Sequence, residues 1–301
     1  MGVDITTIKV TCQDGYQLVG SLFTPQGPSK LKAGIMIAPA TGIKRQFYAS
    51  FAQHLSEQGY GVLTFDNRGI GQSVIGHVSK SKASLQQWGE QDMPAVLDAL
   101  KTYFPGVDYH LVGHSAGGQL IGLMHNAKDI KSVFNFACSS GQLSNMKMPF
   151  KIQAHFFMNV FSPLSNLLFG YTKSDVVGMG EPLPKEAAQQ WRLWCNGTGY
   201  VKTAFGRTVH HHLYDELDMP SFWTNASDDG IAINENVDDM LSVFTKAKAY
   251  AKKKTFRPEA YGLSEIGHMK FFSRKSSNIW SDVIDWFDLH SSTDKSYSPE
   301  K

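Results

Sequence analysis

A serine between two glycines stands where an apolar run gives way to residues at helical spacing. Ser115 is the centre of Gly-His-Ser-Ala-Gly; the apolar run 109–112 precedes it and apolar residues at helical spacing follow between 120 and 124. A Gly-x-Ser-x-Gly turn between a strand and a helix holds a nucleophilic serine in a strained backbone conformation. Gly113 and Gly117 are then needed where a side chain would collide with neighbouring backbone. The pattern predicts that Ser115 is a nucleophile lifted clear of a sheet edge.

A serine hydroxyl needs an imidazole to take its proton, and that imidazole needs an acceptor for its other nitrogen. The chain contains eleven histidines, of which His268 follows the last expected strand and precedes aromatic residues. We expect His268 to be the general base. Asp228 and Asp229 end an earlier expected strand, and either could orient the imidazole. Asp229 is favoured because the apolar run 231–233 follows it, which leaves Asp228 to fix the loop or to face solvent.

The tetrahedral intermediate of such a reaction needs two amides aimed at its oxygen. The amide of Ala116, directly after the nucleophile, should be one of them. The second should come from the loop 39–42, which follows the apolar run 33–38 and consists of small residues. Thr41 is the favoured donor in this loop, with Ala40 as the second choice.

The remaining histidines and the cysteines indicate neither a metal site nor a disulfide framework. His114 adjoins the serine, but a neighbour on such a turn points away, so it is interpreted as a packing residue. The consecutive histidines 210–212 cannot converge on one ion from a regular element. Cys12, Cys138 and Cys195 are widely spaced and form no Cys-x-x-Cys pair, which is typical of a reducing compartment. We therefore expect no metal and no cofactor.

Composition excludes several classes of partner. The formal net charge is +2 with the lysines and arginines scattered, so no nucleic-acid-binding surface is indicated. The lysine run 252–254 is interpreted as a solvated helix end. The chain has no run of about 18 apolar residues, which argues against a membrane span, and residues 1–4 show no signal-peptide pattern. The expected location is the cytoplasm.

Strands and helices alternate along most of the chain, which predicts βαβ units and a mainly parallel sheet. The first two strands should form a hairpin at Asp14-Gly15. The expected strands are 5–11, 16–23, 33–38, 61–65, 109–112, 132–137, 219–225 and 256–261. The expected helices are 47–58, 84–103, 234–250 and 278–289, with a further helix directly after the serine turn.

This alternation stops after the strand 132–137 and resumes near residue 216. About eighty irregular residues are too long for a loop inside a compact domain. We therefore expect an inserted, mainly helical cap at 139–215, with 1–138 and 216–301 forming the core. Most aromatic residues of the cap should form its own core, and a minority should line an apolar pocket near the serine.

Four stretches together resemble the α/β-hydrolase superfamily. They are 65–73 (FDNRGIGQS), 113–118 (GHSAGG), 225–229 (NASDD) and 267–268 (GH). The resemblance is to the capped serine esterase and lysophospholipase-like branch. It implies an α/β fold with an eight-stranded, mainly parallel sheet, helices on both faces, and ester hydrolysis through an acyl-enzyme without a cofactor. It also implies that 66–73 buttresses the active-site loops and that Arg68 is structural. The sequence departs from the superfamily at Pro39-Ala40-Thr41, where His-Gly is common.

The first hypothesis for function is a serine carboxylesterase that acts on a small-molecule ester, with an apolar acyl or alcohol group under the cap. A peptidase, a thioesterase or a carbon–carbon bond hydrolase could use the same Ser115, His268 and Asp229. A peptidase would need an acidic patch for the substrate amine, and the cap sequence contains no acidic run. A non-catalytic binding protein on the same scaffold is the distant alternative. Such proteins usually lack a member of the triad, whereas this sequence contains all three.

Overall fold

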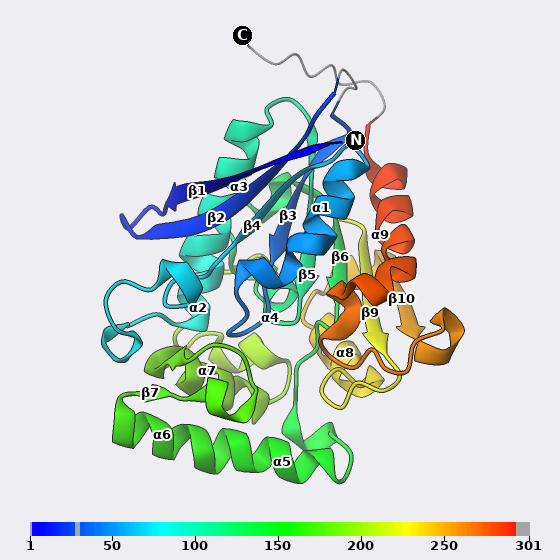
Figure 1. The fold of residues 1–301 in the computed structure, drawn as a ribbon. Coiled ribbons are helices and arrows are strands. Elements are labelled where there is room, and N and C mark those ends of the chain that lie inside the picture. The colour runs from blue at the N-terminus through cyan, green and yellow to red at the C-terminus, as the bar shows by residue number, and fades with distance from the viewer. Residues whose placement is uncertain (1, 28–30, 293–301) are drawn as a thin grey trace.

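The computed structural model describes residues 2–27 and 31–292 and contains a central eight-stranded sheet (Figure 1). The strand order is β1-β2-β4-β3-β5-β6-β9-β10. Strand β2 pairs antiparallel with β1 and β4, and the other neighbours are parallel. The strands are β1 (Val3–Thr11), β2 (Gln17–Pro25), β3 (Ala33–Ala38), β4 (Gly61–Phe65), β5 (Asp108–His114), β6 (Ile130–Phe136), β9 (Ser221–Ala226) and β10 (Ala251–Phe256). This is the mainly parallel eight-stranded sheet that the sequence and the resemblance predicted.

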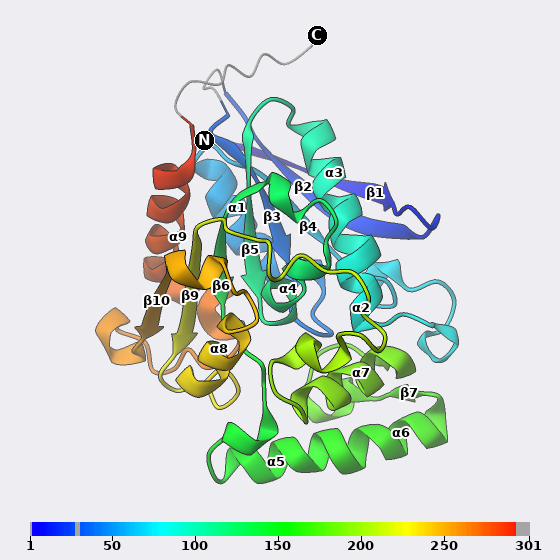
Figure 2. The ribbon, with the colours of Figure 1, turned by 180° about the vertical axis from the view of Figure 1, so that it is seen from behind.

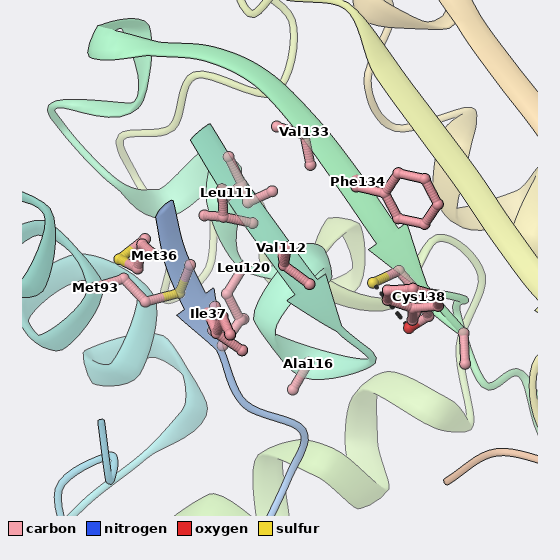
Figure 3. Packing of buried hydrophobic residues seen from close by; sticks show 14 of the residues in the cluster. Met36, Ile37, Met93, Leu111, Val112, Ala116, Leu120, Val133, Phe134 and Cys138 are labelled. Atoms are coloured by element: carbon pink, nitrogen blue, oxygen red, sulfur yellow. Dashed lines mark hydrogen bonds between the residues drawn. The ribbon is translucent and has the colours of Figure 1, made fainter. Parts of the chain in front are cut away.

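Helices cover both faces of this sheet. Figures 1 and 2 show α1 and α9 on one face and α3 and α8 on the other. The bounds are α1 (Ala49–Glu57), α2 (Leu85–Gln87), α3 (Met93–Tyr103), α8 (Asn234–Leu241) and α9 (Ser277–His290), with a π-helical turn at Trp88–Asp92 between α2 and α3. Strands β3 and β4 are buried along their whole length, as expected for apolar runs covered on both faces. Figure 3 shows side chains of β3, β5 and β6 packed with Met93 and Leu120.

The final strand lies earlier than expected. The prediction of a strand at 256–261 is wrong, because β10 ends at Phe256 and a 3₁₀ helix occupies Pro258–Tyr261. Proline has no amide hydrogen to donate to a strand neighbour. The lysine run 252–254, interpreted as a helix end, lies instead on β10 at the edge of the sheet. Lysines on an edge strand discourage pairing with other chains.

Two helices are shorter than predicted. The expected helix 234–250 ends at Leu241, and only a 3₁₀ turn at Ala247–Tyr250 follows. The helix after the serine turn, α4 (Ala116–Gln119), has four residues and is succeeded by a 3₁₀ turn at Ile121–Leu123. The amide of Leu213 donates to the Gly122 carbonyl (2.7 Å). In a longer α-helix that carbonyl would instead accept the amide of the residue four positions later. The Tyr214 ring packs on Gly122 in the same place.

Residues 137–220, between β6 and β9, add no strand to the central sheet; we call this segment the insert. Its elements are α5 (Phe150–Phe156), a π-helical turn (Phe157–Phe161), α6 (Ser162–Phe169), the hairpin β7 (Tyr171–Thr172) and β8 (Leu183–Pro184), and α7 (Lys185–Cys195). In both views the insert lies beyond the carboxyl ends of the parallel strands, where α4 is also found. No helix in the described part of the chain combines the length and apolar character needed to cross a bilayer.

Candidate active site

Ser115 occupies the sharp turn between β5 and α4 in a strained conformation. Its φ is 48° and its ψ is −115°, a region that L-residues other than glycine rarely adopt. A Cβ on Gly117 would lie 2.0 Å from the carbonyl oxygen of Ala38, and one on Gly113 would lie 2.5 Å from the Cα of Gly118. Both glycines therefore stand where backbone approaches backbone, which confirms the reason for expecting them.

His268 is hydrogen-bonded to a buried carboxylate. Its Nδ1 donates to Oδ2 of Asp229 (2.8 Å), and the Asp229 side chain is fully buried. The other carboxylate oxygen accepts the amides of Ile231 (2.7 Å) and Ala232 (3.0 Å). Burial raises the pKa of Asp229, but the His268 charge, its hydrogen bond and the two amides outweigh burial and hold that pKa below its usual 3.8. The carboxylate is thus ionised at neutral pH and able to orient the imidazole.

The structure separates the roles of the two neighbouring aspartates. Asp228 accepts the amides of Ile266 (2.9 Å) and Gly267 (3.0 Å), directly before His268. It therefore fixes the loop that carries the imidazole, which is one of the two roles that the sequence left for it. Asp229, the favoured acid, is the residue that contacts His268.

A chain of buried hydrogen bonds, which we call the Tyr48–His114 relay, links the loop 39–42 to the His268 backbone. The amide of Ala40 donates to the Tyr48 hydroxyl (2.9 Å), which pairs with His114 Nδ1 (2.8 Å). His114 Nε2 pairs with the carbonyl oxygen of His268 (2.9 Å). A carbonyl can only accept, so Nε2 carries the proton and Nδ1 accepts from Tyr48. Burial and the nearby His268 lower the pKa of His114 to about 3, so it is neutral.

Sequence reasoning missed the relay. His114 was interpreted as a packing residue, and it is indeed fully buried, but it also joins the turn of Ser115 to the loop that carries His268. Tyr48 carried no signal beyond being a polar-tipped aromatic in an expected amphipathic helix. A buried tyrosine hydroxyl usually finds a hydrogen-bond partner, which is the one sequence-level hint that it does more than pack.

Ser115 and His268 are brought together through this relay. Because the residue before Ser115 holds the His268 carbonyl, the imidazole is anchored beside the turn. Among the hydrogen bonds of the described residues, none joins the Ser115 hydroxyl to His268. Hydrogen bonds between a catalytic serine and its histidine are often long or poorly aligned until substrate binds.

Two amides near Ser115 are free to bind a developing negative charge. The Ala40 amide is already used by Tyr48, which excludes the second choice for the oxyanion donor. Within the described residues, no acceptor contacts the amides of Thr41 and Ala116, and Ala116 is the first residue of α4. The first amides of a helix have no partner inside it and attract anions.

The segment 66–73 is bonded to the residues directly after the loop 39–42. Asp66, fully buried, accepts the backbone amide of Arg45 (2.7 Å) and pairs with its guanidinium, just after the loop 39–42. Arg68 pairs with Asp92 and Asp14 (both 2.6 Å). Both aspartates belong to the core, so Arg68 is structural, as the resemblance implied.

The insert contacts the same loop. The amide of Glu181 donates to the Gly42 carbonyl (2.7 Å), and its carboxylate pairs with Lys44 (2.8 Å). The Tyr200 hydroxyl faces the Thr41 side chain without a hydrogen bond of ordinary geometry. Tyr200 is fully buried with φ 52°, and burial raises its pKa well above the usual value, so its hydroxyl keeps its proton.

The described residues include no cluster of three or more histidine, cysteine or acidic side chains able to hold a metal ion. The histidines 210–212 do not form one. The three cysteines are free and buried.

Comparison with known proteins gives a consistent fold. A family model described as serine aminopeptidase, S33, matches residues 29–176. A soluble variant of monoglyceride lipase from Saccharomyces cerevisiae, solved with a substrate analogue, superposes with a TM-score of 0.68 at 16% identity, covering 97% of this chain and 99% of that one. An esterase from Pyrococcus furiosus (TM-score 0.60, 14% identity, 96% and 91% covered) and an α/β hydrolase from a Penicillium species (0.60, 14%, 95% and 99%) are also similar. No curated protein sequence matches.

The sheet order and the strained serine turn define an α/β-hydrolase fold. The similar structures share this fold, and the matched family model covers residues 29–176, which include Ser115. The fold class that the sequence predicted is confirmed.

Proposed function

We propose that this hydrolase cleaves carboxylic esters through an acyl-enzyme formed on Ser115, with His268 as general base and Asp229 as its partner. The observation that carries the proposal is the 2.8 Å hydrogen bond between His268 and the buried Asp229, beside a serine held at φ 48°. Ionised Asp229 fixes the imidazole tautomer in which Nε2 is free to accept a proton.

In the first step the Ser115 oxygen attacks the ester carbonyl carbon while His268 Nε2 takes the hydroxyl proton. The carbonyl oxygen becomes an oxyanion, for which the free amides of Ala116 and Thr41 are the donors. Collapse breaks the bond to the alcohol oxygen, which leaves with the proton from His268. A water molecule then repeats the sequence on the acyl-enzyme and releases the acid.

Within the insert, residues 139–215 serve as a cap over this site, and residues 1–138 and 216–301 form the core. Two apolar side chains from the insert lie against loops of this site. The Phe150 ring lies against Gly230, next to Asp229, and Leu183 lies against Gly42, next to Thr41. Leu183 is fully buried and supports the loop 39–42, whereas the partly exposed Phe150 would narrow the approach to Ser115 with hydrocarbon, which favours an apolar acyl or alcohol group.

Hydrolysis of p-nitrophenyl esters from acetate to palmitate tests the proposal, with a long-chain monoacylglycerol included because a structural neighbour is a monoglyceride lipase. Wild type should turn over one range of chain lengths, and Ser115→Ala should lose that activity while remaining folded. A fluorophosphonate probe should label wild type and not the variant. A folded protein with no activity on any ester and no labelling of Ser115 would overturn the proposal.

The description of the matched family model favours one second candidate, an aminopeptidase. A substrate α-amine would need an unpaired carboxylate near Ser115. Glu181 of the insert pairs with Lys44 (2.8 Å). Glu186 pairs with Lys82 through one oxygen (3.5 Å), and its other, buried oxygen has no hydrogen-bond partner among the described residues. Aminoacyl p-nitroanilides, assayed beside the esters, distinguish the two: turnover of the anilides above the esters would establish the peptidase.

A further inference from the structure

One long helix of the insert exposes many of its apolar side chains. Elements α5, the π turn and α6 run continuously over residues 150–169 and form the outer edge of the molecule in both views (Figures 1 and 2). Eight large apolar side chains on or beside this helix are between 47% and 80% exposed, and we call them the apolar stripe. They are Met148, Ile152, Phe156, Val160, Leu164, Leu167, Leu168 and Phe169.

The spacing of the stripe fits the helix that carries it. Most members follow one another at every fourth residue, which in an α-helix advances about 40° beyond a full turn at each step. The π turn at Phe157–Phe161 holds more residues per turn. It therefore reverses part of this drift and keeps Ile152 and Leu168 on the exposed side.

The opposite side of the helix is held against the protein by the buried side chains of Phe157 and Met158 and by polar groups. Ser162 and Thr172 share a hydrogen bond of 2.9 Å, and the Ser165 hydroxyl donates to the Tyr171 carbonyl (3.0 Å). These groups are largely buried, whereas the stripe is not. The helix therefore carries apolar side chains on its outer side as well as on its buried side, whereas the usual surface helix is apolar inward and polar outward. An exposed apolar surface of this kind marks an interaction site.

The charges within the segment that carries the stripe are all of one sign. Residues 130–174 contain no aspartate or glutamate; the next acidic residue is Asp175. Lys147 and Lys151 lie at one end of the helix and Lys173 at the other, with its ammonium 3.8 Å from the centre of the Phe169 ring. Apolar residues flanked by lysines without carboxylates are typical of helices that lie in the interface of an anionic lipid bilayer.

We propose that the apolar stripe and these three lysines dock the protein on an anionic phospholipid surface. The apolar side chains enter the boundary between headgroups and acyl chains, and the lysines contact the headgroup phosphates. A second copy of the chain fits less well. A two-fold pair of antiparallel helices would place the lysines at one end against the lysine at the other end of the second copy.

Docking stands apart from the proposed ester hydrolysis, because it is measured by binding alone. Wild type and Ser115→Ala should sediment equally with vesicles of phosphatidylcholine and phosphatidylglycerol. Binding should be at least about tenfold weaker to vesicles of phosphatidylcholine alone and should fall at high salt. Sedimentation that is equal with both vesicles would exclude the role of the lysines.

Variants locate the contact. Ile152→Glu with Leu167→Glu places charge on the stripe and should weaken vesicle binding by about tenfold or more. Ile75→Glu with Leu289→Glu is the matched control, because these residues are equally exposed (64% and 68%) elsewhere on the surface. Both pairs should keep the wild-type melting temperature; if the first pair unfolds, serine replaces glutamate. Lys147, Lys151 and Lys173 changed to glutamine should weaken binding to the anionic vesicles only.

Three outcomes would overturn the proposal. Wild type could remain in the supernatant with anionic vesicles. The stripe pair and the control pair could bind equally. Wild type could be a dimer that does not bind vesicles and that the stripe pair converts to a monomer, in which case the stripe is a subunit interface. If wild type docks, hydrolysis of a vesicle-embedded ester should fall in the stripe pair while a water-soluble ester is hydrolysed as before.

Discussion

Replacing Tyr48 by phenylalanine removes one oxygen atom and leaves two buried groups without partners. The hydroxyl accepts from the Ala40 amide (2.9 Å) and donates to His114 Nδ1 (2.8 Å), and Tyr48 is fully buried. Each buried group left unpaired costs about 1–3 kcal/mol. For two such groups, Tyr48→Phe should lower the free energy of unfolding by about 2–6 kcal/mol, with little added by the cavity, because the ring stays in place.

The chain offers a matched control for this measurement. Tyr200 is also fully buried, but its hydroxyl makes no hydrogen bond in the described structure. Tyr200→Phe should leave the free energy of unfolding unchanged or raise it, because an unpaired polar group is removed. Urea unfolding of wild type and both variants gives the comparison directly. Equal losses of unfolding free energy in the two variants would refute the reasoning that the hydrogen bonds of the Tyr48 hydroxyl stabilise the folded protein.

The same substitution should affect catalysis through position alone. Loss of the Tyr48 hydroxyl frees the Ala40 amide, directly before Thr41, and removes one of the two hydrogen bonds that hold His114, whose other bond holds the His268 carbonyl. Since the Thr41 amide and the His268 imidazole are the groups proposed to act on the transition state, kcat should fall by roughly tenfold to a hundredfold while KM changes little. Steady-state kinetics on the best p-nitrophenyl ester measures this split. An unchanged kcat in Tyr48→Phe would show that the relay does not position the catalytic groups.

Three further predictions concern the site and its pH dependence. Ser115→Ala and His268→Ala should each reduce kcat by several orders of magnitude, and the double variant should be little worse; additive losses would mean that one residue is misassigned. Asp229→Asn should lower kcat by about 10⁴-fold, whereas Asp228→Asn should mainly lower the melting temperature; the reverse result would exchange their roles. Burial lowers the pKa of both His110 and His114 from 6.5 to about 3. The unfolded chain then binds protons that the folded chain does not, so stability present above about pH 6.5 is lost as pH falls, by roughly 4 kcal/mol at pH 5. Urea unfolding at several pH values measures this slope, which His110→Gln should roughly halve; a flat profile would contradict the assignment.

Much of the central sheet could be predicted from short patterns in the sequence. The apolar runs of β3 and β4 and the Asp14-Gly15 hairpin appear where they were expected. The predictions of element bounds were wrong where a proline or a contact with a distant residue overrode the local pattern. The last strand is Ala251–Phe256, and Pro258 after it cannot donate a strand hydrogen bond. The helix α4 is short, and the amide of Leu213 in the insert binds the Gly122 carbonyl that a longer α4 would have used.

The sequence by itself determined which residues carry the proposed chemistry. The serine turn is a local structure, and the carboxyl ends of parallel strands meet at one edge, so Ser115, the aspartate pair and His268 had to lie together there. Only the tertiary structure distinguished Asp229 from Asp228 and removed the Ala40 amide from the oxyanion site. It alone showed which apolar side chains of helix 150–169 are exposed. These outcomes depend on hydrogen bonds and packing between residues far apart in the chain, which spacing along one sequence does not record.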